Sequence, residues 1–115
     1  MRIREIDNVV VVTVEKEIMQ EDVETVQQTL NNLLLEKNIN VVLDFAQCNY
    51  LTSMGLSVIF HAKKKMAEHG GDIRIARINT LITNLLEMTN LNKAMSIYGT
   101  VEEAVQSFNP GKNND

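Results

Sequence analysis

Apolar residues recur along the chain with two different spacings, and the alternation between them predicts strands followed by helices. The β-branched run VVVVTV at 9–14 predicts a strand that is covered on both faces. Residues 1–6 alternate in polarity and can pair with that run through the polar turn Asp7-Asn8. Further strands are predicted at 40–45, 72–78 and 94–99.

Between the strands, apolar residues fall three and four positions apart, which is the spacing of one helical face. Helices are predicted at 20–37, 51–69, 79–89 and 100–108. Gly70-Gly71 ends the second helix, and Thr100 with Glu103 forms a capping box at the start of the last. The faces defined by this spacing comprise Val23, Val26, Leu30, Leu33 and Leu34, then Leu56, Ile59, Phe60, Lys63, Met66 and Ala67, then Leu81, Leu85 and Met88, and finally Val101, Ala104, Val105 and Phe108.

This order of elements predicts an α/β domain, with a small mixed β-sheet flanked by about four α-helices. A length of 115 residues supports one hydrophobic core. The domain is expected to span residues 1–108. The segment NPGKNND at 109–115 has no apolar anchor and is expected to be a disordered tail.

The composition argues against several classes of protein. With a net charge of −4, the chain has no basic face for nucleic acid, and the run Lys63-Lys64-Lys65 is expected to be a solvated helix face. No apolar stretch approaches the roughly 20 residues that span a bilayer, so no direct membrane contact is expected. The single cysteine, Cys48, allows no internal disulfide and is expected to be an inert filler, which fits a cytoplasmic location.

The residue pattern gives no support to enzymatic chemistry, and the chain is expected not to be an enzyme. His61 and His69 lie eight residues apart, without any metal-ligand spacing or nucleophile motif beside them. The five glycines are too scattered to form a loop that cradles phosphate. We therefore expect no catalytic residue, no metal and no cofactor.

One place remains where a ligand or modification would be stabilised, namely the junction of strand 40–45, loop 46–52 and the helix that follows. The first backbone N–H groups of a helix are unpaired and carry a partial positive charge, so they favour an anion. A phosphate on Thr52 or Ser53 would be held there. The simpler reading is that one of these hydroxyls caps the helix.

The stretch VVLDFAQCNYLTSMGLSVIFHAKKKMAEHGGDIRIA, followed later by MTNLNKAMSIYGTVEEAV, resembles the STAS family of bacterial anti-sigma factor antagonists. The likeness covers about residues 3–108 and implies a single STAS domain. It also implies a role as a switch in transcription regulation. The unphosphorylated antagonist binds an anti-sigma factor that is a serine kinase, phosphorylation of the second hydroxyl residue in Asp-Ser-Ser/Thr-Gly ends the binding, and a phosphatase resets it.

The resemblance departs from the family pattern at the switch itself. Thr52 stands where the family has its aspartate, Ser53 matches the first serine, and Met54 occupies the phospho-acceptor position, followed by the matching pair Gly55-Leu56. Met19 stands where a second acid commonly lies. A thioether has no O–H to accept a phosphoryl group.

These departures leave several readings open. Met54 and Met19 could form one exposed apolar patch for a partner, because methionine suits adaptable hydrophobic contacts, or Met54 could pack back onto the protein. Phosphorylation could use Ser53, as the resemblance to stressosome-type STAS proteins implies, or Thr52.

The favoured hypothesis is a protein-binding module whose phospho-switch is degenerate, with binding that is constitutive or repurposed. Its partner would be an anti-sigma factor or similar serine kinase. The partner-binding residues are expected to be Met19, Gln20, Thr52, Ser53, Met54, Gly55 and Leu56. The alternative is a STAS subunit of a transporter or of a stressosome-type assembly. A nucleotide-binding or hydrolytic domain is the least supported reading, and homodimerisation through an open sheet edge stays undecided.

Overall fold

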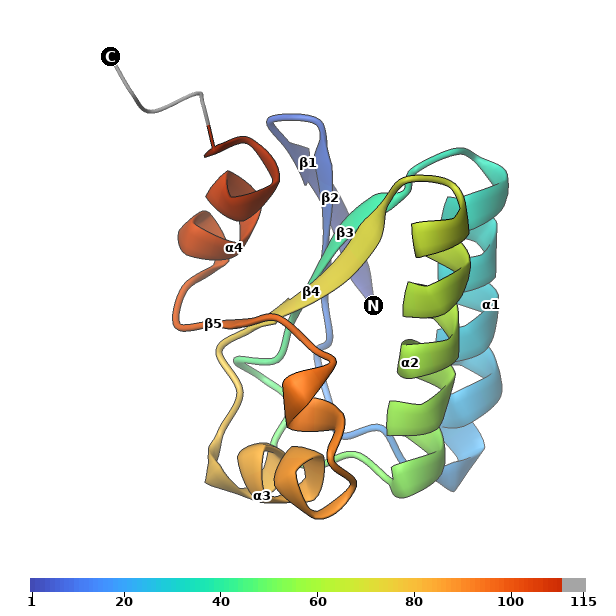
Figure 1. The fold of residues 1–115 in the computed structure, drawn as a ribbon. Coiled ribbons are helices and arrows are strands. Elements are labelled where there is room, and N and C mark those ends of the chain that lie inside the picture. The colour runs from blue at the N-terminus through green and yellow to red at the C-terminus, as the bar shows by residue number, and fades with distance from the viewer. Residues whose placement is uncertain (111–115) are drawn as a thin grey trace.

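In the computed structural model, which describes residues 1–110, the chain forms one mixed five-stranded sheet with helices on both faces (Figure 1). The strands are β1 (Arg2–Ile6), β2 (Val9–Thr13), β3 (Asn40–Asp44), β4 (Asp72–Ala76) and β5 (Ile97–Tyr98), in the spatial order β1-β2-β3-β4-β5. The helices are α1 (Val23–Leu35), α2 (Ser53–Glu68), α3 (Thr80–Met88) and α4 (Val101–Phe108), with short 3-10 turns η1 (Gln20–Asp22) and η2 (Leu91–Lys93). The predicted α/β class and mixed sheet are confirmed.

The first two strands form the predicted hairpin. β1 runs antiparallel to β2, whereas the pairs from β2 to β5 are all parallel. Asp7 and Asn8 have φ angles of 51° and 67°. Two positive φ values in a row give the turn the hand that matches strand twist, and Asn and Asp tolerate this conformation better than other side chains.

The strand β2 is buried on both faces, as its β-branched run predicted. Val10 and Val12 point into the core that α1 and α2 cover, and Val9 and Val11 point into the smaller core under α4. Figure 1 shows this division, with α1 and α2 on one side of the sheet and α4 on the other. A strand with no solvent-exposed face needs a layer of helices on each side of the sheet.

The predicted apolar faces hold for α1 and α4 and for most of α2. On α3 the prediction holds only for Leu85, which packs partly buried against the core; Ile82 and Leu86 are the buried residues, while Leu81 and Met88 are 59% and 82% exposed. The apolar residues of this short helix form one broad arc, and the sequence spacing alone does not show which part of that arc the core covers. Leu81 therefore lies on the surface.

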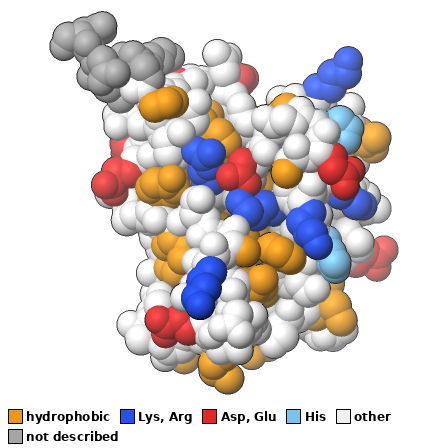
Figure 2. Space-filling model, in the orientation of Figure 1, with side chains coloured by type: hydrophobic (Ala, Val, Ile, Leu, Met, Phe, Trp, Pro, Cys, Tyr) orange, Lys and Arg blue, Asp and Glu red, His pale blue; other side chains and the backbone are white. Residues whose placement is uncertain are grey.

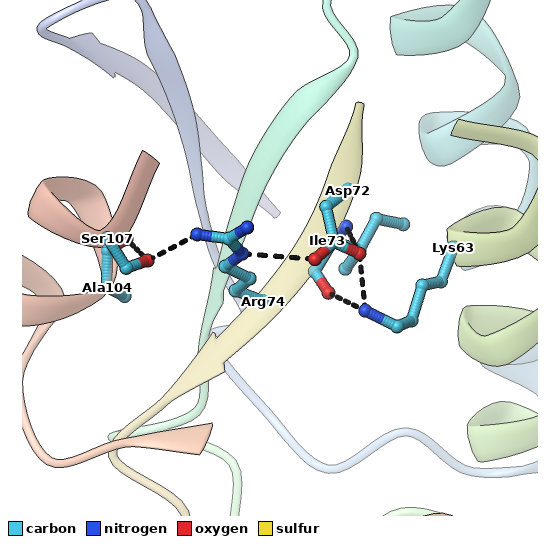
Figure 3. A network of polar contacts seen from close by, with 6 residues as sticks. All are labelled: Lys63, Asp72, Ile73, Arg74, Ala104 and Ser107. Carbon is cyan, nitrogen blue, oxygen red and sulfur yellow. Dashed lines mark hydrogen bonds and ion pairs between the residues drawn. The ribbon is translucent and has the colours of Figure 1, made fainter. Parts of the chain in front are cut away.

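Lys63 is not the solvated residue that the lysine run predicted (Figure 3). Its ammonium group binds the Asp72 carboxylate and lies 3.2 Å from the Ile73 carbonyl oxygen. Asp72 also accepts a hydrogen bond from Arg74 Nε at 3.0 Å, and Arg74 Nη1 donates to Ser107 Oγ at 2.8 Å. This network ties α2 to β4 and then to α4. Burial alone would raise the pKa of Asp72, but its bonds to Lys63 and Arg74 outweigh that effect and lower the pKa.

The segment expected to be a tail begins with a residue that is attached to the domain. Asn109 Nδ2 donates to the Asp7 carbonyl oxygen at 3.1 Å, which links the end of α4 to the β1–β2 turn. The rest of the expected disordered tail, 111–115, lies outside the described residues.

An ion pair between the buried Asp44 carboxylate and the half-exposed Arg77 guanidinium joins the carboxyl ends of β3 and β4. The Asp44 side chain is only 2% exposed, and it accepts hydrogen bonds from Arg77 Nε at 2.9 Å and from the Ala46 backbone N–H at 3.1 Å. Burial by itself would raise the pKa of Asp44, but the bonds from Arg77 and Ala46 hold it below its ordinary value. The pair fixes the start of the loop that leads to α2.

We predict that Asp44→Asn lowers the free energy of unfolding by about 2 kcal/mol at pH 7. This value allows for solvent screening of the pair, because Arg77 is half exposed. A carboxylate whose folded pKa lies below its unfolded value of about 3.9 stabilises the fold fully above about pH 5. That stabilisation is lost as the pH falls through about 4 toward the folded pKa. The difference between wild type and variant in the free energy of unfolding, measured by urea denaturation, should therefore become smaller toward pH 3. Glu36→Gln, at an exposed acid, is the control, and a gap independent of pH would contradict the assignment.

Candidate functional site

The candidate site lies at the end of the molecule where the parallel strands finish and α2 begins (Figure 1). Two connections meet there. One follows β2 and carries Ile18 and Met19, and the other follows β3 and leads through Tyr50 and Leu51 into α2. Ligands of open α/β sheets bind at this carboxyl end, where loops converge.

Backbone pairing holds the two connections together. Ile18 N–H donates to the Tyr50 carbonyl oxygen at 3.0 Å, and Thr52 N–H donates to the Ile18 carbonyl oxygen at 3.0 Å, which makes a short parallel bridge between Ile18 and Leu51. The approach is so close that a Cβ on Gly55 would lie 2.9 Å from Ile18 Cγ2. Met19, the next residue, is thereby placed beside the first turn of α2.

The backbone at Met19 is held by an aspartate three residues later. Met19 N–H donates to Asp22 Oδ2 at 2.9 Å, and Lys16 Nζ donates to the other carboxylate oxygen at 3.0 Å. The backbone hydrogen bond from Met19, followed by the bond from Lys16, lowers the pKa of Asp22. The Met19 side chain itself stays 40% exposed.

Thr52 is the N-cap of α2. Its backbone is extended, and its Oγ1 accepts a hydrogen bond from the Gly55 N–H at 3.0 Å. Threonine therefore does the capping that an aspartate could do at the same place, but without the negative charge. The capping interpretation of Thr52 is confirmed.

Ser53 is exposed at the first position of α2, and its hydroxyl makes no hydrogen bond with any residue of the described part of the chain. The backbone N–H groups at this end of the helix have no partner within the helix. Of the two candidate phospho-acceptors, Ser53 is the one with a free and accessible oxygen, since the Thr52 oxygen is used as the cap.

The structure separates the seven expected partner-binding residues into two groups. Met19, Gln20, Ser53 and Met54 are exposed and Thr52 is partly so, with Met54 at 53%. Gly55 and Leu56 are buried, because α2 turns that side toward Ile18 and the core. These two residues support the site from beneath and offer no surface to a partner. Met54 points to solvent and does not pack back as filler.

Two exposed apolar residues at this end were missed in the sequence, namely Tyr50 (44% exposed) and Leu81 (59%). Asn79 caps α3 by accepting from Ile82 N–H at 2.9 Å, and its Nδ2 donates to the Asn49 carbonyl oxygen at 2.9 Å. The start of α3 is thus attached to the loop that carries Tyr50. The sequence signal that could have predicted the role of Asn79 is its residue type, because asparagine is a favoured N-cap.

We call Met19, Tyr50, Met54 and Leu81 the end surface. Figure 2 shows hydrophobic side chains scattered among polar ones over the lower part of the face in view, around α3 and the start of α2. Exposed methionine and tyrosine side chains at the end of a sheet where connections meet are residue types enriched at protein-binding surfaces.

Within residues 1–110, no cluster of three or more His, Cys, Asp or Glu side chains could hold a metal ion. Cys48 is 1% exposed, burial raises the pKa of its thiol, and its Sγ donates to the Tyr50 carbonyl oxygen at 3.3 Å. It therefore has the inert, filling role that was predicted. No helix in the described part is both long and apolar enough to cross a bilayer.

Comparison with known proteins places this arrangement in a family. The family model of the STAS domain matches residues 1–104. The chain belongs to the STAS family. The resemblance read from the sequence is therefore confirmed.

Individual relatives agree with this assignment. A Thermotoga maritima protein, provisionally named an anti-sigma factor antagonist, is 26% identical over 102 residues, covering 88% of this chain and 90% of its own. A crystal structure of an antagonist so named from the same organism has a TM-score of 0.87 at 23% identity, over 92% of each chain. The anti-sigma factor antagonist SpoIIAA in its unphosphorylated form has a TM-score of 0.74 at 11% identity, over 96% of this chain and 97% of its own. SpoIIAA of Bacillus in its phosphorylated form has a TM-score of 0.73 at 14% identity, over 93% of this chain and 97% of its own.

We predict that Thr52→Ala lowers the free energy of unfolding by about 1 kcal/mol, because the Gly55 N–H loses its acceptor. Thr52→Ser keeps the oxygen and should stay close to wild type. Urea denaturation of the three proteins measures the difference. Equal stability of the alanine and serine variants would contradict the capping role.

Proposed function

We propose that this STAS domain is an anti-sigma factor antagonist-like binding module, which binds an anti-sigma factor of the serine-kinase type through the end surface. One observation carries the proposal. Met54, which stands where the resemblance puts the phospho-acceptor, is 53% exposed, and Met19, on the connection that is bridged to the residues just before α2, is 40% exposed. The position that would carry a phosphate in the switch offers an apolar contact instead.

The chemistry of this position explains why the usual switch is degenerate. A phosphate adds about 1.5–2 negative charges and acceptor oxygens to a surface. Met54 has no hydroxyl to receive it, and Thr52 supplies the helix cap without the charge of an aspartate. Binding at the end surface is then not ended by phosphorylation at position 54, so it is constitutive toward the kinase or serves a related partner.

The energetics of the end surface fit a binding role. Met19 and Met54 are about half exposed, so a partner that covers them removes apolar area worth roughly 1 kcal/mol each. Their flexible side chains adapt to a partner without a fixed pocket. The rigid base comes from the Ile18–Leu51 bridge and the Thr52 cap, both of which hold the backbone beneath these side chains. The relatives named anti-sigma factor antagonists support the same class of function.

We predict that Met54→Asp reduces capture of a kinase-type anti-sigma factor from native lysate by roughly tenfold or more, because it buries a charge against an apolar contact. Met54→Leu should capture as wild type does, since the side chain keeps its size and polarity. Captured proteins are identified by mass spectrometry of the peptides.

A second control tests whether the end surface is the site. Leu35 is 80% exposed at the last position of α1, at the opposite end of the molecule, so Leu35→Asp should leave capture unchanged. Equal loss with Leu35→Asp would show a non-specific effect of charge. Capture of a transporter component in place of the kinase would replace the proposed function with the transporter reading.

One observation favours a second, narrower candidate, phosphorylation at Ser53. Its hydroxyl is exposed and unbonded within the described residues, at a helix N-terminus that favours an anion. Regulation by phosphorylation would then take place at Ser53, one position before Met54. Ser53 followed by the bulky Met54 matches the stressosome-type pattern that the resemblance implied, although Thr52 stands where that pattern has an acid.

For this candidate we expect one phosphate on Ser53 after incubation with the captured kinase, Mg²⁺ and ATP, and none in Ser53→Ala. Mass spectrometry of the tryptic peptide 38–63 locates the phosphate. Met54→Ser restores a hydroxyl at the family's acceptor position and is the positive control for kinase activity. Modification of Met54→Ser alone, with wild type unmodified, would remove Ser53 as an acceptor.

A further inference from the structure

The sulfur-containing residues of the chain divide sharply between interior and surface. Cys48, Met66 and Met95 are 1%, 0% and 5% exposed. Met1, Met19 and Met54 are 39%, 40% and 53% exposed, and Met88 reaches 82%. A diffusible oxidant therefore meets thioethers at the surface, while the single thiol is enclosed and, with its raised pKa, is not present as the reactive thiolate.

Two of the exposed thioethers lie on neighbouring segments of the end surface. Met19 follows Ile18, whose backbone is bonded on both sides to Tyr50 and Thr52, and Met54 lies in the first turn of α2. Neither side chain contributes to the core, so a change in its polarity is free of a large cost in folding. The same change falls directly on the surface that we assign to the partner.

We propose that Met19 and Met54 are both oxidation-sensitive residues of the end surface, and that conversion of their thioethers to sulfoxides by a peroxide switches off binding there. This inference rests on the proposed function and deepens it, because it supplies a regulation that position 54 cannot obtain from phosphate.

The reaction is a two-electron oxygen transfer. A lone pair on the methionine sulfur attacks one oxygen of hydrogen peroxide, the O–O bond breaks, and an S–O bond forms. The sulfur is oxidised to the sulfoxide, the peroxide is reduced, and the proton released in the transfer joins the departing hydroxide to give water. The sulfoxide is polar and is reversed by methionine sulfoxide reductases. An apolar contact thus becomes a polar one that a hydrophobic partner surface does not match.

The first test needs no partner. The purified chain is treated with limiting hydrogen peroxide, and sulfoxides are located by peptide mass spectrometry over time. We expect Met19 and Met54 to oxidise roughly tenfold faster than the buried Met66 and Met95, with the circular dichroism spectrum unchanged. Oxidation of the buried pair at the same rate, or loss of the spectrum, would overturn the proposal.

The second test measures the consequence. Treated wild type should bind the captured kinase roughly tenfold more weakly than untreated protein, and reductase treatment should restore binding. The double variant Met19→Leu with Met54→Leu has nothing to oxidise at the end surface and should bind equally before and after peroxide. Met88→Leu removes the most exposed methionine outside the end surface and should behave as wild type does.

The outcomes separate the two proposals. If untreated protein captures no kinase-type partner, the proposed function fails. The effect of oxidation on the end surface is then measured by the retention of treated and untreated protein on a phenyl matrix. Peroxide should lower the retention of wild type but not of the double variant. Equal binding and equal retention of treated and untreated wild type would overturn the switch, even where the kinase is captured.

Discussion

Burial of β2 on both faces is the constraint on which the rest of the molecule depends. β2 has no solvent-facing side, so α1 and α2 must cover one face of the sheet and α4 the other. Parallel pairing of β2, β3 and β4 then brings their carboxyl ends to one edge. The connections leave the sheet there, and the site has no other place to form.

Polar interactions then fix the relative positions of strand ends, connections and helices. The Asp44–Arg77 pair joins the ends of β3 and β4, and the Ile18–Leu51 bridge joins the two connections. The network through Lys63, Asp72 and Arg74 extends from α2 across β4 to α4. The exposed methionines of the end surface are therefore adaptable side chains on a backbone that hydrogen bonds hold in place.

The chain keeps the frame of a STAS domain, while Thr52, Met54 and Met19 differ from the residues that the resemblance implies at those positions. Thr52 preserves the helix cap, and Gly55 preserves the close approach of Ile18. The backbone needs an acceptor for the Gly55 N–H and space beside Ile18, and it needs both whether or not a phosphate is ever added. No such backbone contact depends on the side chains of Met54 and Met19. Their chemistry could change without loss of the fold.

The sequence by itself determined the order of strands and helices, the Asp7-Asn8 hairpin, a hydroxyl cap at Thr52 or Ser53 and the lack of a hydroxyl at position 54. These features depend on local spacing or on the chemistry of single residues. Only the tertiary structure decided which part of the broad apolar arc of α3 is buried, because the core covers Ile82 and Leu86 but leaves Leu81 and Met88 exposed. It also decided that Lys63 binds Asp72, that Met19 lies beside α2, and that Leu56 is covered while Met54 is exposed. Those outcomes depend on contacts between segments distant in sequence, which no local pattern encodes.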